Sequence, residues 1–199
     1  MEVRVALIVG AGLPLGQQVA RSLAAAGLRV ALNDLLPNHI EALAAELNAA
    51  GGQAAAYPTD LSRKLGLQTM LQAILESWGR IDILLLIPAV RPSTALLDLD
   101  EWDWHRALDL NLTAAFLCVQ SVGRVMRELG SGLIITVIGE TEANSAVYPV
   151  AAAGLEALTK AAAAELGAYN IQVHSFSGKQ DPQAILQLCL KERAPISSL

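Results

Sequence analysis

Charged and aromatic side chains are scarce in this sequence, and its cysteines and histidines form no pattern that would support a metal site. Charged residues make up 17% and aromatic residues 4% of the 199 residues. The cysteines Cys118 and Cys189 fit no metal-ligand spacing and no disulfide framework, which agrees with a reducing compartment. His39, His105 and His174 share no spacing typical of a metal site or a catalytic triad. We therefore predict no metal ion.

Long apolar runs and clusters of positive charge are also absent. The net charge is −5 and no stretch is rich in Lys or Arg, so we expect neither a nucleic acid nor a membrane as partner. Uncharged apolar stretches such as residues 83–87 fall far short of the roughly 20 residues that cross a bilayer. The first expected strand follows Met1 almost directly, without the organisation of a signal peptide. A cytoplasmic location is therefore expected.

Hydrophobic residues, in contrast, make up 53% of the chain and recur in a regular rhythm. Short β-branched or leucine-rich runs alternate with longer helical stretches, which is typical of α/β folds. The sequence predicts a doubly wound parallel sheet in a Rossmann-like three-layer sandwich. Strands are expected at 3–9, 28–33, 53–57, 81–87, 133–138 and 171–176, and helices at 14–26, 38–50, 63–77, 100–129, 147–167 and after Pro182.

The expected domain organisation follows from the length, because one hydrophobic core commonly serves roughly 50–200 residues. We expect a single dinucleotide-binding domain over residues 1–193 and a flexible tail over residues 194–199. The long fourth helix is expected to break near Asn111. Asn38 followed by Glu41 predicts a capping box at the start of the second helix.

A glycine cluster follows the first expected strand and leads straight into a helix. Residues 10–16 read Gly-Ala-Gly-Leu-Pro-Leu-Gly. Free backbone N–H groups and the helix dipole at such a turn favour a phosphate group. Gly10 would permit the tight turn, and Gly16 a close approach of helix and strand. The sequence therefore predicts a phosphate site at Gly10, Gly12 and Gly16, with a merely tight strand-to-helix turn as the alternative.

Two aspartates follow the next two strands. Asp34 ends the second strand, roughly two dozen residues after Gly10, where a carboxylate can accept hydrogen bonds from an adenosine ribose and repel a 2′-phosphate. Asp34 thus favours NAD over NADP, and a solvated loop aspartate is the alternative. Asp60 is ambiguous from the residues alone, because an aspartate after the third strand could equally cap the next helix.

These residues carry a resemblance to the short-chain dehydrogenase/reductase family that extends along the whole chain. It is strongest at residues 10–16, 60–61, 101–116 and 148–173. The resemblance implies a Rossmann-like fold and nicotinamide-dependent oxidation or reduction of a small alcohol or carbonyl compound. It also implies that Asp60, Leu61 and Ala89 lie beside the cofactor, with Asp60 at the adenine. By the same resemblance, Asn111 is the active-site asparagine and Tyr148 the general acid/base.

The lysine of the family's Tyr-x-x-x-Lys motif is replaced by Ala152. In the family this ammonium holds the nicotinamide ribose and assists the tyrosine, and an unaided phenol is ionised in only about one molecule in a thousand at pH 7. Lys160 cannot replace it, because twelve residues of helix separate it from Tyr148 by roughly 18 Å. Lys179, just past the sixth strand, is a candidate substitute.

The family's catalytic serine is also missing. Gly139 stands at the end of the fifth strand, where the family usually has a pair of serines, and the loop that follows is short. Thr141 or Ser145 could reach the site, although a solvated loop hydroxyl is the alternative for each. Glu140 and Glu142 would place negative charge near any oxyanion.

Three further departures affect the cofactor and substrate regions. Pro14 replaces the middle glycine of the family's phosphate turn and cannot donate a backbone N–H, although proline fits the first position of a helix. Residues 87–90 read Ile-Pro-Ala-Val where the family usually has Asn-Asn-Ala-Gly. After residues 177–178 the chain passes almost at once to residues 181–186, without the family's helical lid, and an open crevice excludes water poorly.

These observations lead to one main hypothesis and two rivals. The main hypothesis is a divergent, shortened family member with an NAD-type site that is impaired or inactive in the Tyr-Lys-Ser mechanism and acts by binding or assembly. The first rival is an active NAD(P)-dependent oxidoreductase with a rearranged site using Tyr148, Asn111 and Lys179. The second is an accessory subunit of a complete family member. On the resemblance we expect a homodimer or homotetramer through helices near 111–129 and 147–167.

Overall fold

The computed structural model describes residues 3–88, 90–140, 145–177 and 181–191. The expected tail at 194–199 lies outside these residues. The strands are β1 (Val5–Val9), β2 (Arg29–Asp34), β3 (Gln53–Pro58), β4 (Ile83–Leu86), β5 (Gly132–Ile138) and β6 (Ile171–Ser177). The helices are α1 (Pro14–Ala25), α2 (Pro37–Ala49), α3 (Lys64–Trp78), α4 (Glu101–Leu108), α5 (Ala114–Leu129), α6 (Val147–Leu166) and α7 (Pro182–Leu190), with a π-helix η1 (Asp109–Thr113) and a 3₁₀ turn η2 (Gly167–Tyr169).

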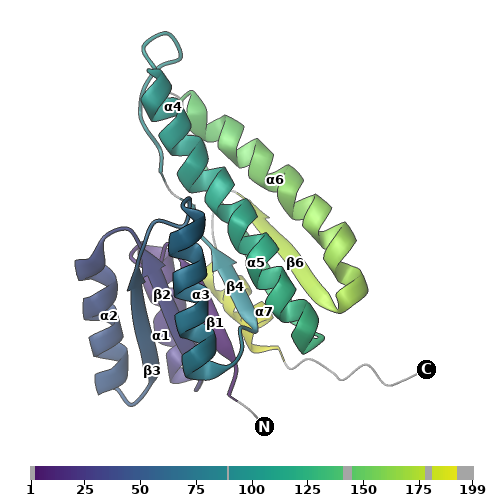
Figure 1. The fold of residues 1–199 in the computed structure, drawn as a ribbon. Helices are drawn as coiled ribbons and strands as arrows, with labels where there is room; N and C mark the ends of the chain where they lie inside the picture. The colour runs from purple at the N-terminus through teal and green to yellow at the C-terminus, as the bar shows by residue number, and fades with distance from the viewer. Residues whose placement is uncertain (1–2, 89, 141–144, 178–180, 192–199) are drawn as a thin grey trace.

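The six strands form one parallel sheet in the order β3-β2-β1-β4-β5-β6 (Figure 1). The central strand β1 pairs with β2 on one side and β4 on the other, so that Leu7 lies opposite Ala31 and Leu84. The strand order reverses between β1 and β4, and ligands of open α/β sheets bind at such a reversal. The predicted doubly wound, Rossmann-like α/β fold is therefore confirmed.

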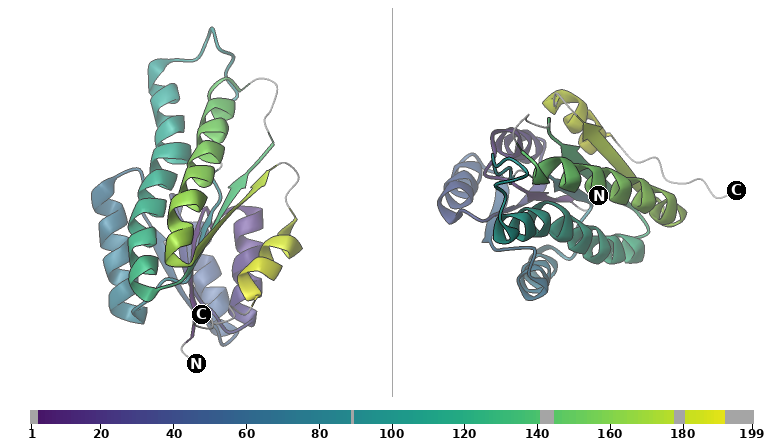
Figure 2. Two further views of the ribbon diagram at one scale, coloured as in Figure 1. Left: turned by 90° about the vertical axis from the view of Figure 1, so that its right-hand side faces the viewer. Right: turned by 90° about the horizontal axis from the view of Figure 1, so that it is seen from above.

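Helices cover both faces of the sheet, as the two views of Figure 2 show. Alternate residues of β1 point to opposite faces, as the pleat requires. Val5 and Leu7 join the apolar cluster under α3, α5 and α6, whereas Ala6 and Ile8 join the cluster under α1, α2 and α7. All four are fully buried, which explains why the strands read as continuous apolar runs rather than alternating ones.

The long helical stretch before β5 breaks where it was expected to. The chain leaves α4 through the π-helix η1, which contains Asn111, and enters α5 at Ala114. A π-helical turn inserts one extra residue into the hydrogen-bond ladder and changes the direction of nearby side chains. The break therefore decides where the Asn111 side chain points.

The predicted capping box at Asn38 and Glu41 is wrong. Helix α2 begins one residue earlier, at Pro37, after Leu36, and no side chain caps its first N–H groups. Proline suits this position because it has no N–H to satisfy and its φ angle is already helical. The local signal of Asn38 was therefore overridden by the residue before it.

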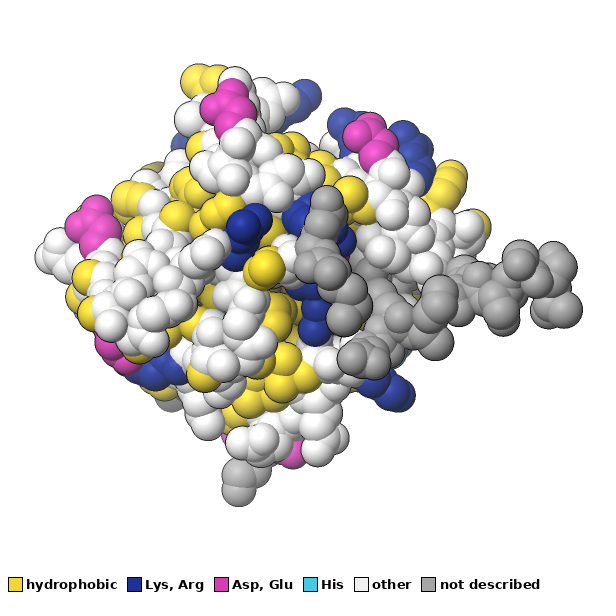
Figure 3. Space-filling model, turned by 90° about the horizontal axis from the view of Figure 1, so that it is seen from below, with side chains coloured by type: hydrophobic (Ala, Val, Ile, Leu, Met, Phe, Trp, Pro, Cys, Tyr) yellow, Lys and Arg dark blue, Asp and Glu magenta, His cyan; other side chains and the backbone are white. Residues whose placement is uncertain are grey.

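The surface carries both signs of charge. On the face seen from below, basic and acidic side chains are spread among hydrophobic ones (Figure 3). Among the described residues, no helix is long and apolar enough to cross a membrane, and no three His, Cys, Asp or Glu side chains come together as a metal site would need. Cys118 and Cys189 are both buried and unpaired.

Candidate functional site

The glycine turn after β1 is shaped by close contacts that only glycine permits. Gly10 has φ +81, and its N–H and that of Ala11 both donate to the Asn33 carbonyl at 2.9 Å. A Cβ at Gly10 would strike the Ile87 carbonyl, and one at Gly16 would strike the Gly10 carbonyl. The turn is therefore held tightly between β1, β2 and the end of β4.

The N-terminus of α1 presents free donors beside this turn. Pro14 occupies the first turn of the helix, as the sequence suggested, and no side chain caps it. The first helical hydrogen bond runs from the Gln17 N–H to the Leu13 carbonyl at 2.9 Å. The N–H groups of Leu15 and Gly16 precede that bond and have no helical acceptor. Two backbone donors and the positive end of the helix dipole thus remain for an anion.

The Asp34 carboxylate lies against the glycine turn rather than in open solvent. Its Oδ2 accepts a hydrogen bond from the Gly12 N–H at 3.0 Å, and its Oδ1 accepts one from the Leu36 N–H at 3.2 Å. A Cβ at Gly12 would lie 2.8 Å from Oδ2, so the glycine makes this approach possible. Gly12 and Asp34, which are 22 residues apart, therefore form one corner of the crevice.

An open pocket of about 180 Å³ lies at the carboxyl ends of β1, β2 and β3. Gly10, Asp34 and Leu61 line it, and Val90 and Leu110 contribute from the far side. The Leu61 side chain is buried in its wall. We call this part of the crevice, with Gly12 and Gly16, the first half. It lies at the strand-order reversal, where open α/β sheets bind ligands.

Asp60 ties the end of β3 to α4. Its carboxylate accepts hydrogen bonds from the Ser62 N–H at 2.9 Å and the Ser62 hydroxyl at 2.6 Å, and forms an ion pair with Arg106 at 2.8 Å. Burial acts to raise the pKa of this carboxyl group, but the bonds from Arg106 and Ser62 outweigh it and the pKa is lowered. Asp60 is not a helix cap, because Arg63 holds the N-cap position of α3.

Tyr148 lies in the first turn of α6 and is only 1% exposed. Its hydroxyl accepts a hydrogen bond from the Gly139 N–H at 2.9 Å. The guanidinium carbon of Arg91 lies 4.5 Å from the centre of its ring. The phenol is therefore enclosed by the end of β5 and by the segment that follows β4.

Asn111 is 2% exposed, and both ends of its carboxamide are used within the chain. Its Oδ1 accepts from the Val90 N–H at 3.0 Å, and its Nδ2 donates to the Val90 carbonyl at 2.6 Å. No hydrogen bond between Asn111 and Tyr148 is found among the described residues. The structure thus places Asn111 as an anchor of the segment after β4.

Ala152 stands at the position of the family's lysine and is packed among apolar side chains. Ala152 is 9% exposed and belongs to the same apolar cluster as Tyr148 and Leu155. Lys160 lies on the exposed side of α6 and pairs with Glu156 at 2.8 Å, so it does not replace the missing ammonium. Among the described residues, no hydrogen bond or cation–π contact joins a lysine to Tyr148.

The remaining predicted site residues lie partly outside the described part of the chain. Ala89, Thr141 and Lys179 lie outside the described residues, so their predicted roles stay predictions. Ser145 is described and is 8% exposed. Its hydroxyl is buried without a hydrogen-bond partner, and so is the Nε of Arg91.

Arg91 is the site residue that sequence reasoning missed. A Cβ at Gly139 would overlap the Nη2 atom of Arg91, so the guanidinium lies where a side chain at position 139 would begin. The signal was present in the sequence, because Arg91 follows β4 and Gly139 follows β5, and neighbouring parallel strands end at the same edge. We call Arg91, Asn111, Gly139, Tyr148 and Ala152 the second half of the crevice.

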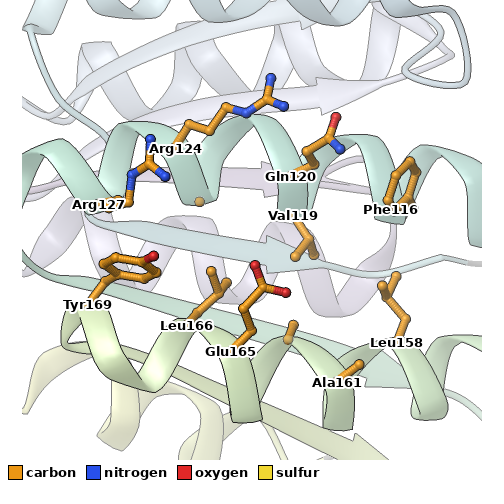
Figure 4. A pocket seen from close by; sticks show the side chains of 12 residues that line it. Phe116, Val119, Gln120, Arg124, Arg127, Leu158, Ala161, Glu165, Leu166 and Tyr169 are labelled. Atoms are coloured by element: carbon orange, nitrogen blue, oxygen red, sulfur yellow. The ribbon is translucent and has the colours of Figure 1, made fainter.

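A second hollow, of about 360 Å³, lies between α5 and α6 and away from the crevice. Side chains of both helices point into it (Figure 4). Phe116 and Tyr169 are 44% and 41% exposed, and the Arg127 guanidinium lies 5.6 Å from the centre of the Tyr169 ring. These are the helices from which an assembly surface was expected.

The parallel sheet, the glycine turn and the open crevice define a Rossmann-like α/β protein with a ligand site at the strand-order reversal. The family model described as enoyl-(acyl carrier protein) reductase matches residues 10–179. The 3-oxoacyl-[acyl-carrier-protein] reductase of Synechocystis sp. is 31% identical over 179 residues, which cover 87% of this chain and 72% of that protein. The chain belongs to the short-chain dehydrogenase/reductase family.

Solved structures agree with this assignment. A short-chain type dehydrogenase/reductase from Mycobacterium marinum superposes with a TM-score of 0.85 and 27% identity, covering 94% of this chain and 86% of that one. An NAD⁺-bound xylitol dehydrogenase superposes with a TM-score of 0.84 and 27% identity, covering 94% of this chain and 75% of that one. The family's fold is therefore retained.

Proposed function

We propose that this protein retains an NAD-type adenosine site but does not carry out hydride transfer by the family's Tyr-Lys-Ser mechanism, and that it acts by binding or assembly. One observation carries the proposal. Tyr148 is 1% exposed, with its hydroxyl on the Gly139 N–H and its ring beneath Arg91. Ala152 supplies no cation beside it.

Binding is supported by the first half of the crevice. Backbone donors at the start of α1 suit a diphosphate, and the Asp34 carboxylate beside Gly12 suits a ribose diol. A solved relative is described as NAD⁺-bound xylitol dehydrogenase. In this chain Asp34 favours NAD over NADP, because a carboxylate would repel a 2′-phosphate. Asp34→Ala is expected to weaken NAD binding about tenfold and to reduce the preference over NADP.

Restricted access of a substrate to the Tyr148 hydroxyl supports the proposed loss of the standard catalysis. A general acid/base must come within about 2.6–3.2 Å of the substrate oxygen, directly or through one water. The Tyr148 hydroxyl faces the Gly139 backbone, and Arg91 covers one face of its ring. A carbonyl substrate would have to displace Arg91 or break the Gly139 contact before proton transfer.

Calorimetry with NAD(H) and NADP(H), followed by a broad screen of alcohols and ketones, tests the proposal. We expect NAD(H) binding without turnover in the wild type and in Ala152→Lys, because an ammonium alone does not move Arg91. Turnover by the wild type that Tyr148→Phe abolishes would overturn the proposal. Gain of turnover in Ala152→Lys would show that only the lysine was missing.

The rival reading, an active oxidoreductase with a rearranged site, is favoured by one contact. Arg91 places a cation 4.5 Å from the centre of the Tyr148 ring, and a cation beside a phenol is what the family's lysine provides. If Arg91 takes that role, Arg91→Ala abolishes turnover together with Tyr148→Phe. The same screen therefore decides between the two functions.

Assembly through α5 and α6 into a homodimer or homotetramer is the second part of the proposal. The hollow between these helices is bordered by exposed apolar and aromatic side chains, and large apolar patches commonly mark interaction sites. Ala161→Arg places a charge in it and is expected to shift the protein towards the monomer in analytical ultracentrifugation. Lys160→Ala, one residue away on the exposed side of α6, is the control. Unchanged mass in Ala161→Arg would exclude this surface.

A further inference from the structure

The two halves of the crevice differ in how much room they leave. The first half contains the open pocket beside Gly10 and Asp34. In the second half, Arg91 fills the space beside Tyr148 and Gly139. In doubly wound folds a dinucleotide lies across the crevice, with one nucleotide on each side of the strand-order reversal. An open pocket therefore lies on one side of the reversal, whereas Arg91 obstructs the other side.

Arg91 is packed into the second half from three sides. The Tyr148 ring of α6 lies beneath the guanidinium at 4.5 Å. The bare Cα of Gly139 makes room for Nη2, since a Cβ there would overlap it. Nη1 donates to the Glu140 carbonyl at 3.4 Å. Among the described residues no carboxylate forms an ion pair with Arg91, so packing and this long hydrogen bond hold the side chain in place.

The segment that carries Arg91 is fixed on both sides of it. Before it, Val90 is held through its N–H and its carbonyl by the buried Asn111 side chain. After it, the Thr94 carbonyl accepts a hydrogen bond from the Ala146 N–H at 3.3 Å, at the start of α6. A segment held at both ends cannot swing out as a unit without breaking these bonds. Opening the second half therefore requires the Arg91 side chain itself to leave.

We propose that Arg91 closes the second half, so that the crevice recognises the adenosine diphosphate part of a nucleotide and gains nothing from the nicotinamide. The ligand class is adenosine diphosphate and its ribose derivative, with NAD bound only through that shared portion. This inference rests on the adenosine site of the proposed function. Its physical reason is that a nicotinamide must first displace Arg91 and then finds no ammonium at Ala152 to hold its ribose.

Calorimetric titration with a ladder of ligands tests the inference. AMP, ADP, ADP-ribose and NAD⁺ add one part of the cofactor at a time, NADH is the reduced form of the last, and nicotinamide mononucleotide represents the second half alone. We expect ADP-ribose and NAD⁺ to bind with dissociation constants within about threefold of each other, and nicotinamide mononucleotide not to bind.

Two variants open the second half by different routes. Arg91→Ala removes the guanidinium, and Gly139→Ala displaces it by adding a Cβ while keeping the charge. Both are expected to raise the affinity for NAD⁺ relative to ADP-ribose by about three- to tenfold. Arg29→Ala is the matched control, because Arg29 begins β2 at the other end of the strands and its side chain donates to Gln53 at the surface. Thermal melts confirm that each variant is folded.

The outcomes separate this inference from the proposed function. If wild-type protein binds NAD⁺ ten or more times as tightly as ADP-ribose, or if neither variant changes the ratio, Arg91 does not close the site and the inference is overturned while NAD binding stands. If no ligand of the ladder binds, the adenosine site itself is refuted and the inference is lost with it. Equal binding in the wild type and a shifted ratio in the variants support it.

Discussion

The first and second halves of the crevice differ in the surroundings of their polar groups. In the first half, the N–H groups of Leu15 and Gly16 lie at an uncapped helix start, and Asp34 borders an open pocket. In the second half, the polar groups of Asn111 and Tyr148 are bonded to backbone of the same chain. Asp34 also accepts backbone N–H groups, from Gly12 and Leu36, but each of its oxygens keeps a lone pair beside the open pocket. The two halves therefore differ in the polar atoms that remain available.

This difference teaches that the position of a residue in a motif is not enough to assign it a catalytic role, because its polar atoms must also be available. Asn111 and Tyr148 occupy the positions that the family resemblance assigns to catalysis. Both side chains are buried and hydrogen-bonded to backbone of the same chain, and a buried group that leaves its partner loses that bond. Four variants, from the largest expected effect to the smallest, examine this contrast.

The largest effect is expected in the glycine turn of the first half. Gly10→Ala combines a strained positive φ with a clash on the Ile87 carbonyl, and should lower the free energy of unfolding by about 3 kcal/mol. Gly27→Ala is the control, because Gly27 has φ +84 but no atom within 4 Å of its Cβ position. The free energy of unfolding of Gly27→Ala should fall by only about 1 kcal/mol. Urea denaturation measures both; equal losses would show that close approach is unimportant.

The next largest effect is expected at Asn111 in the second half. Asn111→Ala leaves the buried N–H and carbonyl of Val90 unpaired and should lower the free energy of unfolding by about 2–3 kcal/mol. Asn48 makes the same two-fold contact with the Ala54 backbone, at 2.8 and 2.9 Å, but in an exposed place. Water can replace the Asn48 side chain there, so the free energy of unfolding of Asn48→Ala should fall by about 1 kcal/mol or less. A small loss at Asn111 would mean that its carboxamide is free for another role.

A smaller effect is expected from removal of the Tyr148 hydroxyl. Tyr148→Phe loses the bond from the Gly139 N–H and should be destabilised by about 1 kcal/mol, with nucleotide affinity unchanged. Tyr57→Phe is the control, because no hydrogen bond to the Tyr57 hydroxyl is found among the described residues. Denaturation and calorimetry are run on both. A change in nucleotide affinity at Tyr148 would place it in the ligand site.

The smallest effect is a pH dependence at the edge of the first half. The pKa of Asp60 is lowered in the folded protein, so its stabilising contribution is complete above the ordinary carboxyl pKa near 4 and is lost as the pH falls through the lowered value. Asp60→Asn should therefore cost no more than about 1 kcal/mol at pH 7, and the difference from wild type should vanish in acid. Urea denaturation of both proteins at a series of pH values measures this difference.

Much of the fold could be predicted from the sequence because its signals are local. The apolar runs predicted all six strands, and the glycine cluster predicted the turn in which Gly10 adopts a positive φ. The break near Asn111 was also predicted. Asn38 misled, because Pro37 starts the helix more effectively one residue earlier. Arg91 was missed, because its packing on Tyr148 depends on Gly139, which is 48 residues further along the chain.

By itself, the sequence determined the parallel sheet, the glycine turn and the small side chains at Gly139 and Ala152, since each depends on residue type and on nearby residues. Only the tertiary structure decided what fills the second half of the crevice. That choice depends on three segments meeting at the edge of the sheet, where the volume left by one missing side chain is taken up by another.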